Sequence, residues 1–399
     1  MSSLKYWIWI STRTGIGPAR IKKLVAHFGS PENIYNAKDR DYFDVSGIKH
    51  EDIKWLKIKE LDFANKILYS CAELGYSIIT MQDSNYPDRL RNIYDPPTVL
   101  YVKGNLPFID DMPVVGVVGT RNCTPYGISA AEKIGYDLSC KGIIVSTGLA
   151  KGVDTTVANG ALRGGTPVIG VIASGLDIIY PPENKKLFYD VSRAGAIISE
   201  YPPGAPAIRQ NFPARNRIIS GISLGVAVIE APKKSGALIT AARALEQGRD
   251  VFVLPGNVDA VSCEGSNNLL KEGAIPLLSA EDIIDEYVDL YPDKISTANA
   301  NTAGKRKAKN SIDNTTKVDY IDLVNLLEEL DGDEKSIVES IGSNSVYVDD
   351  IIINTGFPAQ KVLAALTILE LNGYINSDSD GKWEVTKSSV NHILQSVDK

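Results

Sequence analysis

The stretch that decides the fold is "PVVGVVG", Pro113–Gly119, a short apolar run that ends in glycine. Five similar runs follow: "GIIVSTG" (142–148), "PVIGVIASG" (167–175), "GAIISEY" (195–201), "LGVAVIEA" (224–231) and "DVFVLPG" (250–256). Each is rich in Val and Ile and apolar on both faces, which is typical of parallel strands covered by helices on both sides. Helical patterns lie between them. These repeated units predict an α/β fold with an extended Rossmann-like, doubly wound, mostly parallel sheet.

Around this sheet, the 399 residues divide into three regions and a linker. Residues 1–70 have helical patterns, and residues 71–290 hold the sheet. Residues 291–316, "YPDKISTANANTAGKRKAKNSIDNTT", are small, polar and locally basic, which predicts a flexible linker. In residues 317–399, "DDIIINTGFPAQKVLAALTILELNGYINSDSDGKWEVT" predicts a helix, a turn, a second helix and a hairpin. This order is the pattern of a winged helix.

Composition narrows the class of protein. The hydrophobic fraction, 44%, suffices for a buried core, and no apolar run approaches the ~18 residues of a membrane span. The start lacks the pattern of a signal peptide. Four cysteines without any CxxC pair suit a reduced, cytoplasmic protein and give no zinc signal. The net charge of -7 does not exclude a nucleic-acid partner, because local charge decides that.

The turn after the first parallel strand is "VVGTRNCTPYG", residues 117–127. Gly119 stands between a strand and a helix, where α/β sheets bind anions through free backbone N–H groups. The dinucleotide motif G-x-G-x-x-G and the P-loop motif are both absent, and the second strand ends in Ser146 and Thr147 without an acidic residue for a ribose. Arg121 places a fixed cation in this turn. We interpret it as an anion site, the alternative being a surface arginine.

Within the sheet region, the stretch "RQNFPARNRIISG", residues 209–221, carries three arginines and contains no acid. Pro213 suits the first turn of a helix, so we expect Arg215 and Arg217 in that same turn, where cations oppose the helix dipole unless an anion docks. Proline also disfavours helix at the preceding residue, so we expect Phe212 in extended backbone. Arginines around an aromatic ring suit single-stranded nucleic acid: cations track phosphates and the ring stacks on a base. The alternative is a solvated basic face with Phe212 buried.

A second glycine-led helix start occurs at Ser235-Gly236, where the serine can cap the helix, help to bind phosphate, or both. Catalysis has little support. The three histidines, His27, His50 and His392, lie outside the sheet region, which therefore lacks the commonest general base. G-x-S-x-G and any metal-ligand cluster are also absent. We therefore expect no enzyme activity, no cofactor and no metal.

Several motifs in order resemble the DNA-processing protein A (DprA/Smf) family: "GTRNCTPYG", "STGLAKGVDTTVANGAL", "SGLDIIYPPENKKL", "SEYPPGAPAIRQNFPARNRIISGIS" and "SGALITAARALEQGRDVFVLPGN". The resemblance covers about residues 75–285. It implies a bacterial cytoplasmic protein of natural transformation that binds and protects incoming single-stranded DNA, forms a homodimer through its Rossmann-like domain and loads the RecA recombinase. The N-terminal region resembles that family's sterile-alpha-motif-like or helix-hairpin-helix domain, and the tail resembles its winged-helix domain.

The resemblance also implies which residues bind DNA, with Arg121 on phosphate and Phe212 as the stacking ring. The implied set is Gly119, Thr120, Arg121, Gly148, Arg209, Phe212, Arg215, Asn216, Arg217, Ser235, Gly236 and Thr240. Two departures stand out. Val157-Ala158 replace the usual Ala-His, and Ala237 replaces the usual Ser. The missing histidine puts in doubt any pocket ligand that would need it. It does not affect the expected contacts between the arginines and the phosphates.

Other functions stay open. The layout is similar to LOG-type nucleotide phosphoribohydrolases, but in "SGALITAAR" Thr240 is followed by Arg243 where their motif has the needed Glu. A winged-helix transcription regulator would carry several Arg, Lys, Asn or Gln on its reading helix, whereas "AQKVLAALTILELNGYI" has one cation, Lys361. The N-terminal "GIGPARIKK" is either a phosphate clamp near Gly15 and Gly17 or a tight turn.

Overall fold

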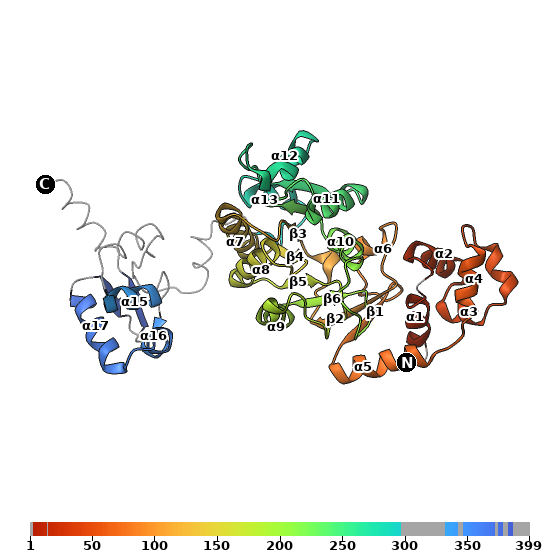
Figure 1. Cartoon of the computed structure of the whole chain (residues 1–399), viewed down its shortest axis with the longest axis horizontal. Helices are drawn as coiled ribbons and strands as arrows, with labels where there is room; N and C mark the ends of the chain where they lie inside the picture. The colour runs from red at the N-terminus through yellow and green to blue at the C-terminus, as the bar shows by residue number, and fades with distance from the viewer. Residues whose placement is uncertain are drawn as a thin grey trace. The chain divides into compact units, whose positions relative to one another are not determined.

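The computed structural model describes residues 3–13, 15–296, 332–341, 346–371, 374–377 and 382–385. The chain forms two compact units, Met1–Gly304 and Lys305–Lys399 (Figure 1). The first unit contains the N-terminal helices and a large sheet, and the second is a small helical and stranded unit. The predicted linker, 291–316, lies outside the described residues from 297 onward.

The N-terminal helices are α1 (Leu4–Ser11), α2 (Pro18–Phe28), α3 (Pro31–Asn36), α4 (His50–Leu56) and α5 (Asp62–Leu74). Proline starts two of them: Pro18 and Pro31 stand at first positions, where their missing N–H would have no partner in any case. Their buried side chains join the same hydrophobic cluster as the sheet. The boundary predicted at residue 70 falls inside α5, which leads into the first strand, and remains a prediction.

The sheet of the first unit has nine strands in the order β1-β2-β6-β5-β4-β3-β7-β8-β9. The strands are β1 (Ser77–Thr80), β2 (Val99–Gly104), β3 (Val114–Val118), β4 (Ile144–Thr147), β5 (Val168–Val171), β6 (Ala196–Ser199), β7 (Gly225–Val228), β8 (Asp250–Val253) and β9 (Ile275–Pro276). From β6 to β9 all neighbours are parallel, whereas β1 and β2 pair antiparallel at one edge. The predicted α/β class with a mostly parallel sheet is confirmed.

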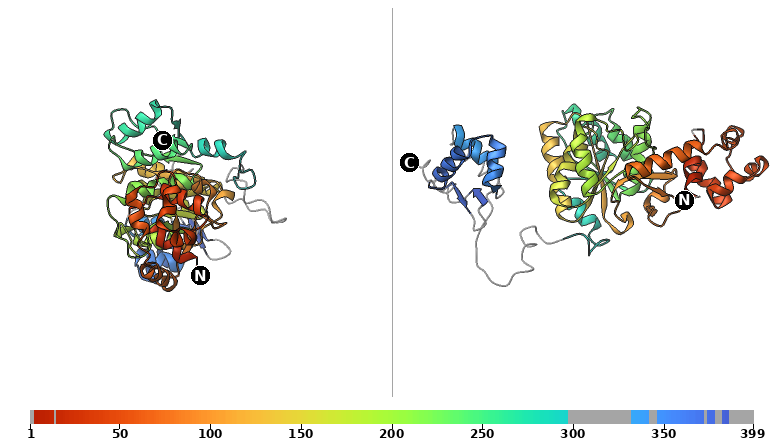
Figure 2. Two further views of the ribbon diagram at one scale, coloured as in Figure 1. Left: turned by 90° about the vertical axis from the view of Figure 1, so that its right-hand side faces the viewer. Right: turned by 90° about the horizontal axis from the view of Figure 1, so that it is seen from below.

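Helices cover both faces of the sheet (Figures 1 and 2). One face carries α7 (Pro125–Cys140), α8 (Val153–Gly164) and α9 (Lys185–Ala194), and the other carries α10 (Asn211–Ile222) and α11 (Gly236–Glu246). The short helices α6 (Asp88–Arg91), α12 (Glu264–Lys271) and α13 (Glu281–Tyr287) complete the unit. Because β3 lies between β4 and β7, the winding reverses there, and α/β sheets bind ligands at the carboxyl ends of strands at such a switch point.

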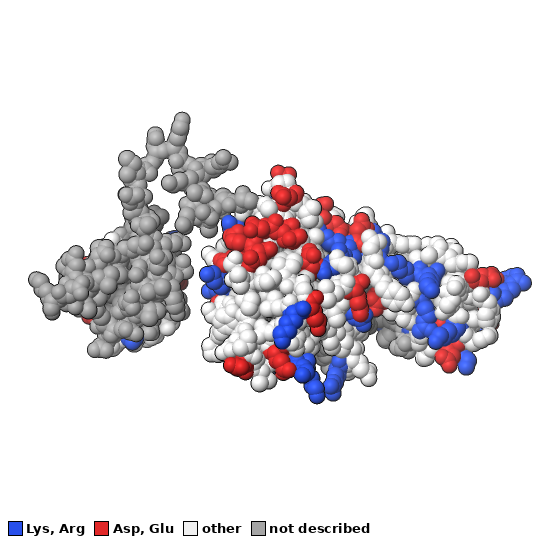
Figure 3. Space-filling view, turned by 90° about the horizontal axis from the view of Figure 1, so that it is seen from above, with Lys and Arg blue, Asp and Glu red and all other residues white. Residues whose placement is uncertain are grey.

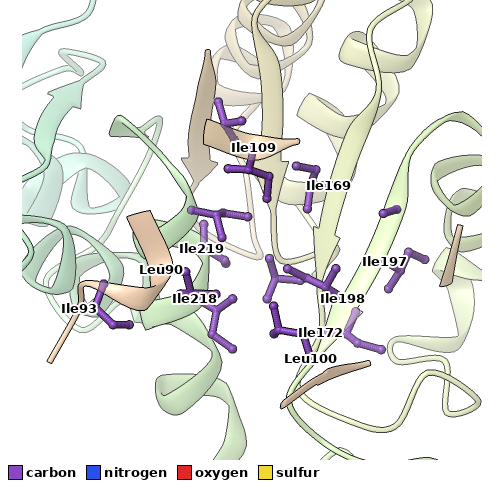
Figure 4. Packing of buried hydrophobic residues seen from close by; sticks show 14 of the residues in the cluster. Leu90, Ile93, Leu100, Ile109, Ile169, Ile172, Ile197, Ile198, Ile218 and Ile219 are labelled. Carbon is purple, nitrogen blue, oxygen red and sulfur yellow. The ribbon is translucent and has the colours of Figure 1, made fainter. Parts of the chain in front are cut away.

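Helix α10 is fixed on the sheet by buried aliphatic side chains. Figure 4 shows Ile218 and Ile219 of this helix close to Leu90 of α6 and to Ile93 just after it. All four are at most 4% exposed. Burying one such side chain contributes ~1.5–3 kcal/mol, so the packing holds α10 in place. The residues at its N-terminal end are thereby positioned over the carboxyl ends of the central strands.

The second unit contains α15 (Gly332–Ile341), β10 (Val346–Tyr347), α16 (Val348–Thr355), α17 (Ala359–Leu371), β11 (Ile375–Ser377) and β12 (Lys382–Val385). Its sheet has the order β10-β12-β11, and its core includes Ile337, Ile351 and Leu366. This order matches the predicted winged helix, although the hairpin loop, 378–381, lies outside the described residues. Among the helices described, none is by itself long and apolar enough to cross a membrane.

Candidate nucleic-acid interface

A cavity of about 340 Å³ opens at the carboxyl ends of β3 and β7, which is the switch point of the sheet. Four segments line it: the turn after β3, the start of α8, one face of α10 and the turn into α11. Nine of the twelve predicted DNA-binding residues meet here: Gly119, Thr120, Arg121, Phe212, Arg215, Asn216, Ser235, Gly236 and Thr240. The lining also includes Asp154 and Lys234, which were not predicted.

The start of α7 is already occupied by a carboxylate of the protein itself. Glu230, at the end of β7, accepts hydrogen bonds from the backbone N–H of Thr124 at 2.9 Å and from its hydroxyl at 2.6 Å. A Cβ on Gly127 would lie 2.2 Å from Glu230 Oε2. In Rossmann folds the pyrophosphate of a dinucleotide binds at this helix start. The occupied position therefore agrees with the absence of G-x-G-x-x-G, and only the tertiary structure reveals Glu230 there.

The start of α10 corrects two expectations. The helix begins at Asn211, so Phe212 lies in its first turn and not in extended backbone. Arg215 and Arg217 consequently fall beyond the first turn, and the argument that they oppose the helix dipole loses its basis. Pro213 is tolerated because the first four N–H groups of a helix have no intrahelical partner. Packing of the helix outweighs the preference of a residue before proline for extended backbone.

Phe212 is half-buried at the rim of the cavity, between an aromatic ring and a cation. Its ring meets that of Tyr180 edge-on at 5.6 Å between centroids. On another side, the guanidinium of Arg121 lies 5.2 Å from the ring centroid, a cation–π contact. The ring is thus held in one place while Arg121 itself stays exposed. Tyr180 was not predicted, and a lone Tyr in the loop after β5 gave no sequence signal.

Arg215 forms the floor of the cavity and is only 4% exposed. Its Nη1 donates to the carbonyl oxygens of Gly148, at 2.7 Å, and Val171, so it ties α10 to the ends of β4 and β5. Gly148 does not line the cavity, yet a Cβ on it would lie 2.5 Å from this guanidinium. The neighbouring Asn216 donates through Nδ2 to the carbonyl of Gly236 at 3.2 Å, which links α10 to α11.

Asp154 is the carboxylate that lines the cavity. It is buried and accepts from the backbone N–H groups of Gly148 at 3.1 Å and Ala150 at 3.3 Å. Burial raises the pKa of Asp154 to about 6, although Arg215 and these N–H groups oppose the shift. Burial also lowers the pKa of Arg215 to about 10, so this side chain stays cationic at neutral pH. With Arg121 and Lys234, three cations face one carboxylate, which favours an anionic ligand.

The start of α11 offers an open helix N-terminus. Ser235 caps the helix, because its hydroxyl accepts from the N–H of Ala237 at 3.2 Å. A Cβ built on Gly236 meets nothing within 4 Å, so the space beside this first helical residue is open. Free N–H groups and the helix dipole both favour an anion at such a position. Ser235 can therefore cap the helix without closing the site.

Arg209 and Arg217, which the resemblance implies as DNA-binding residues, do not line this cavity. Arg209 is exposed in the turn before α10. Arg217 is buried on the opposite side of the helix, where its Nη2 donates to Glu200 at 2.6 Å and its Nε to Asp95 at 3.2 Å. Residues two positions apart on a helix point to different sides. Arg215 and Arg217 have this spacing, so their side chains cannot both reach one ligand.

Two further features bear on the sequence predictions. Val157 and Ala158, which stand where the DNA-processing family usually has Ala-His, are fully buried in α8 and do not line the cavity.

Charge is unevenly spread over the surface: on the face in Figure 3, Asp and Glu gather over the sheet-bearing part of the first unit, and Lys and Arg are prominent on its N-terminal helices. The acidic net charge therefore does not describe each part of the surface.

The fold and the cavity define a Rossmann-like α/β protein with a cationic, aromatic-rimmed site at its switch point. Comparison with known protein families identifies the family to which the chain belongs. Residues 77–288 match the sequence model described as DNA recombination-mediator protein A, and residues 325–381 match the DprA winged helix domain. The chain belongs to the DNA recombination-mediator protein A (DprA/Smf) family, and the resemblance seen in its motifs is confirmed.

Individual relatives of the chain support this family assignment. The chain is 32% identical to Protein Smf of Synechocystis over 404 residues, 96% of this chain and 99% of the relative. It is similar to the X-ray structure of DprA from Streptococcus pneumoniae, with a TM-score of 0.62, 34% identity, and coverage of 71% of this chain and 97% of the other. A structure concerned with the single-stranded DNA binding mode of DNA processing protein A from Helicobacter pylori matches with a TM-score of 0.50, 30% identity, and coverage of 54% and 97%.

Proposed function

We propose that this protein binds single-stranded DNA in the switch-point cavity, protects incoming DNA during natural transformation and loads the RecA recombinase on it. It acts in the cytoplasm, as a homodimer formed through the Rossmann-like domain, without enzyme activity or cofactor. The observation that supports this best is the convergence of nine predicted residues, from three separate segments, on one cationic cavity. The division into residues 1–70, 71–290, 291–316 and 317–399 is part of the same proposal.

The chemistry of the cavity suits a single strand. A phosphate placed beside Gly236 would meet the open N-terminus of α11, and the exposed Arg121 lies on the same cavity. An unstacked base has a ring to rest on in Phe212, and stacking of this kind tolerates any base. In a duplex the bases are stacked inside and cannot reach that ring. The relative from Helicobacter pylori, whose structure concerns single-stranded DNA binding, supports the same choice of ligand.

The test is fluorescence anisotropy with single- and double-stranded oligonucleotides of equal length. We expect the full chain to prefer the single strand, and Arg121→Ala and Arg209→Ala each to weaken binding without loss of the folded state. Arg193→Ala is the matched control, because Arg193 is 78% exposed on α9 and pairs with Asp190. Wild-type affinity in both test variants would refute the proposed site.

The proposed partners need their own experiments. Sedimentation of the full chain at several concentrations tests the homodimer. RecA loading is tested by following RecA filament formation on single strands that are coated with a single-strand-binding protein. We expect this protein to shorten the lag, and an unchanged lag would remove RecA from the proposal while leaving DNA binding intact.

Two alternative functions have less support. For a LOG-like phosphoribohydrolase, Thr240 does line the cavity, but Arg243 is 43% exposed, pairs with Glu246 and lies outside it. A sensitive assay of nucleoside monophosphate hydrolysis tests this function. For a winged-helix regulator, Lys361 on α17 already pairs with Asp333 at 2.8 Å, so the one cation of that helix is engaged within the second unit.

A further inference from the structure

A second cavity, of about 620 Å³, lies against the opposite side of α10. Phe212, Arg215 and Asn216 face the switch-point cavity, whereas Pro213, Ala214 and Arg217 face the second one. Its other walls come from the N-terminal helices and the turn between α1 and α2, from the loop after β6, and from Asp95 and Arg243. One helix therefore separates the two cavities, and both reach its N-terminal end. We call the second one the α10 back cavity.

One unsatisfied donor and one unsatisfied acceptor belong to an ion pair in the wall of the back cavity. Arg217, 4% exposed, bonds to Glu200 through Nη2 and Oε2 at 2.6 Å. Its Nε donates to Asp95 at 3.2 Å, but Arg217 Nη1 and Glu200 Oε1 are buried and without a hydrogen-bond partner in the described parts of the chain. Both residues line the cavity. Buried polar groups are rarely left unpaired, so this pair is suited to a ligand edge that offers an acceptor beside a donor.

The charge on this pair is balanced, and the other two cations of the lining are engaged elsewhere: Arg13 Nε donates to the carbonyl of Trp9 and Arg243 pairs with Glu246. Phe63, in the first turn of α5, lines the cavity and is 56% exposed, and Tyr201, Pro202 and Pro213 provide further flat surface. Because Arg217 is paired with both Glu200 and Asp95, it offers little net positive charge to a phosphate. A planar ring with a donor–acceptor edge matches these flat side chains and the Arg217–Glu200 pair, and a nucleobase is such a ring.

We propose that the back cavity takes an unstacked nucleobase of the same strand whose phosphates dock in the switch-point cavity. The base would stack on Phe63 and present its hydrogen-bonding edge to Arg217 Nη1 and Glu200 Oε1. The strand would cross the N-terminal end of α10, a distance of about one helix diameter, roughly 10–12 Å. This inference rests on the proposed binding of single-stranded DNA and adds a second base site to it.

The test compares the full chain with Phe63→Ala on two ligands, a single-stranded oligonucleotide and an abasic strand of the same length. The abasic strand keeps every phosphate and lacks the bases. We expect Phe63→Ala to weaken binding of the base-bearing strand about fivefold or more, since stacking one base contributes ~1 kcal/mol at least. Binding of the abasic strand should be unchanged, and Phe63→Tyr should restore most of the lost affinity.

Phe43→Ala is the matched control, because Phe43 is 54% exposed in the short 3-10 helix Asp39–Asp44 between α3 and α4 and does not line the back cavity. It should bind both ligands like the parent chain. Equal binding by Phe63→Ala and the parent on the base-bearing strand overturns the inference. An equal loss on both strands also overturns it, because the contact would then be to the backbone. If the parent chain binds neither strand, the proposed function itself fails and the inference falls with it.

Discussion

We propose that Phe212 stacks on a base, because its ring is half-buried and held between Tyr180 and Arg121. We expect Phe212→Ala to weaken single-strand binding by ~1–3 kcal/mol at every salt concentration, with the salt slope nearly unchanged. Arg121→Ala should instead flatten the slope by about 0.7, because it removes a phosphate contact. Anisotropy titrations at four salt concentrations measure both quantities.

The control for Phe212→Ala is thermal stability. Truncating a fully buried Phe costs ~3–5 kcal/mol, and a half-buried ring at a cavity rim should cost less. A variant that melts much earlier than the parent, yet binds normally while folded, would show that the ring serves packing. The arginines alone would then remain as the DNA-binding part of "RQNFPARNRIISG".

Arg217 has a different role from its neighbour Arg215. Replacing it by Met leaves the carboxylates of Glu200 and Asp95 without their partner, and breaking a buried ion pair in this way costs ~3–5 kcal/mol. We expect Arg217→Met to lower the free energy of unfolding by about this amount in urea titrations. Single-strand binding below the melting range should keep its salt slope, since Arg217 does not line the switch-point cavity, where we propose that the phosphates dock. A flatter slope in this variant would place a phosphate contact at Arg217 after all.

At the scale of elements, the N-terminus of α11 is a position where one substitution should weaken DNA binding without lowering the stability of the protein. A side chain at position 236 has open space, and an acidic residue in a first turn stabilises a helix by ~0.3–1 kcal/mol. The same carboxylate would repel phosphate. We therefore expect Gly236→Asp to melt at the same or a higher temperature and to bind single strands at least tenfold more weakly.

Gly236→Ala is the matched control for this prediction, because it fills the position without charge. It should bind closer to the parent chain than Gly236→Asp does. Unchanged binding by Gly236→Asp would mean that no phosphate approaches α11, and the anion site would then have to be assigned to the turn that carries Arg121.

At the scale of the whole molecule, the first unit should bind single strands without the second. Ile295 is 3% exposed in the core of the first unit, whose bounds are Met1–Gly304, so a truncation should end after Gly304 rather than at Tyr291, where the predicted linker starts. We expect residues 1–304 to fold cooperatively and to keep most of the single-strand affinity. A folded truncation that binds no DNA would move the main site to the second unit.

Much of this architecture could be predicted from local sequence. Six short Val- and Ile-rich runs, separated by helical patterns, specify parallel strands because burial on both faces leaves no polar alternation. Turn residues such as Gly119 and Arg121 stand directly after a strand, so their place at the switch point follows from topology. The winged-helix order likewise followed from helical spacing and a hairpin pattern.

Only the tertiary structure decided which side chains contact one another. The start of α10 is set by packing of Ile218 and Ile219, which overrides the local preference of Phe212 before Pro213. Arg215 and Arg217 look equivalent in the sequence, yet one meets Gly148 and Asp154 while the other meets Glu200 and Asp95, because successive helical residues point in different directions. The sequence determined the fold and the presence of a cationic site. Contacts between residues far apart in the chain determined that Arg215 lines the switch-point cavity and that Arg217 pairs with Glu200 and Asp95.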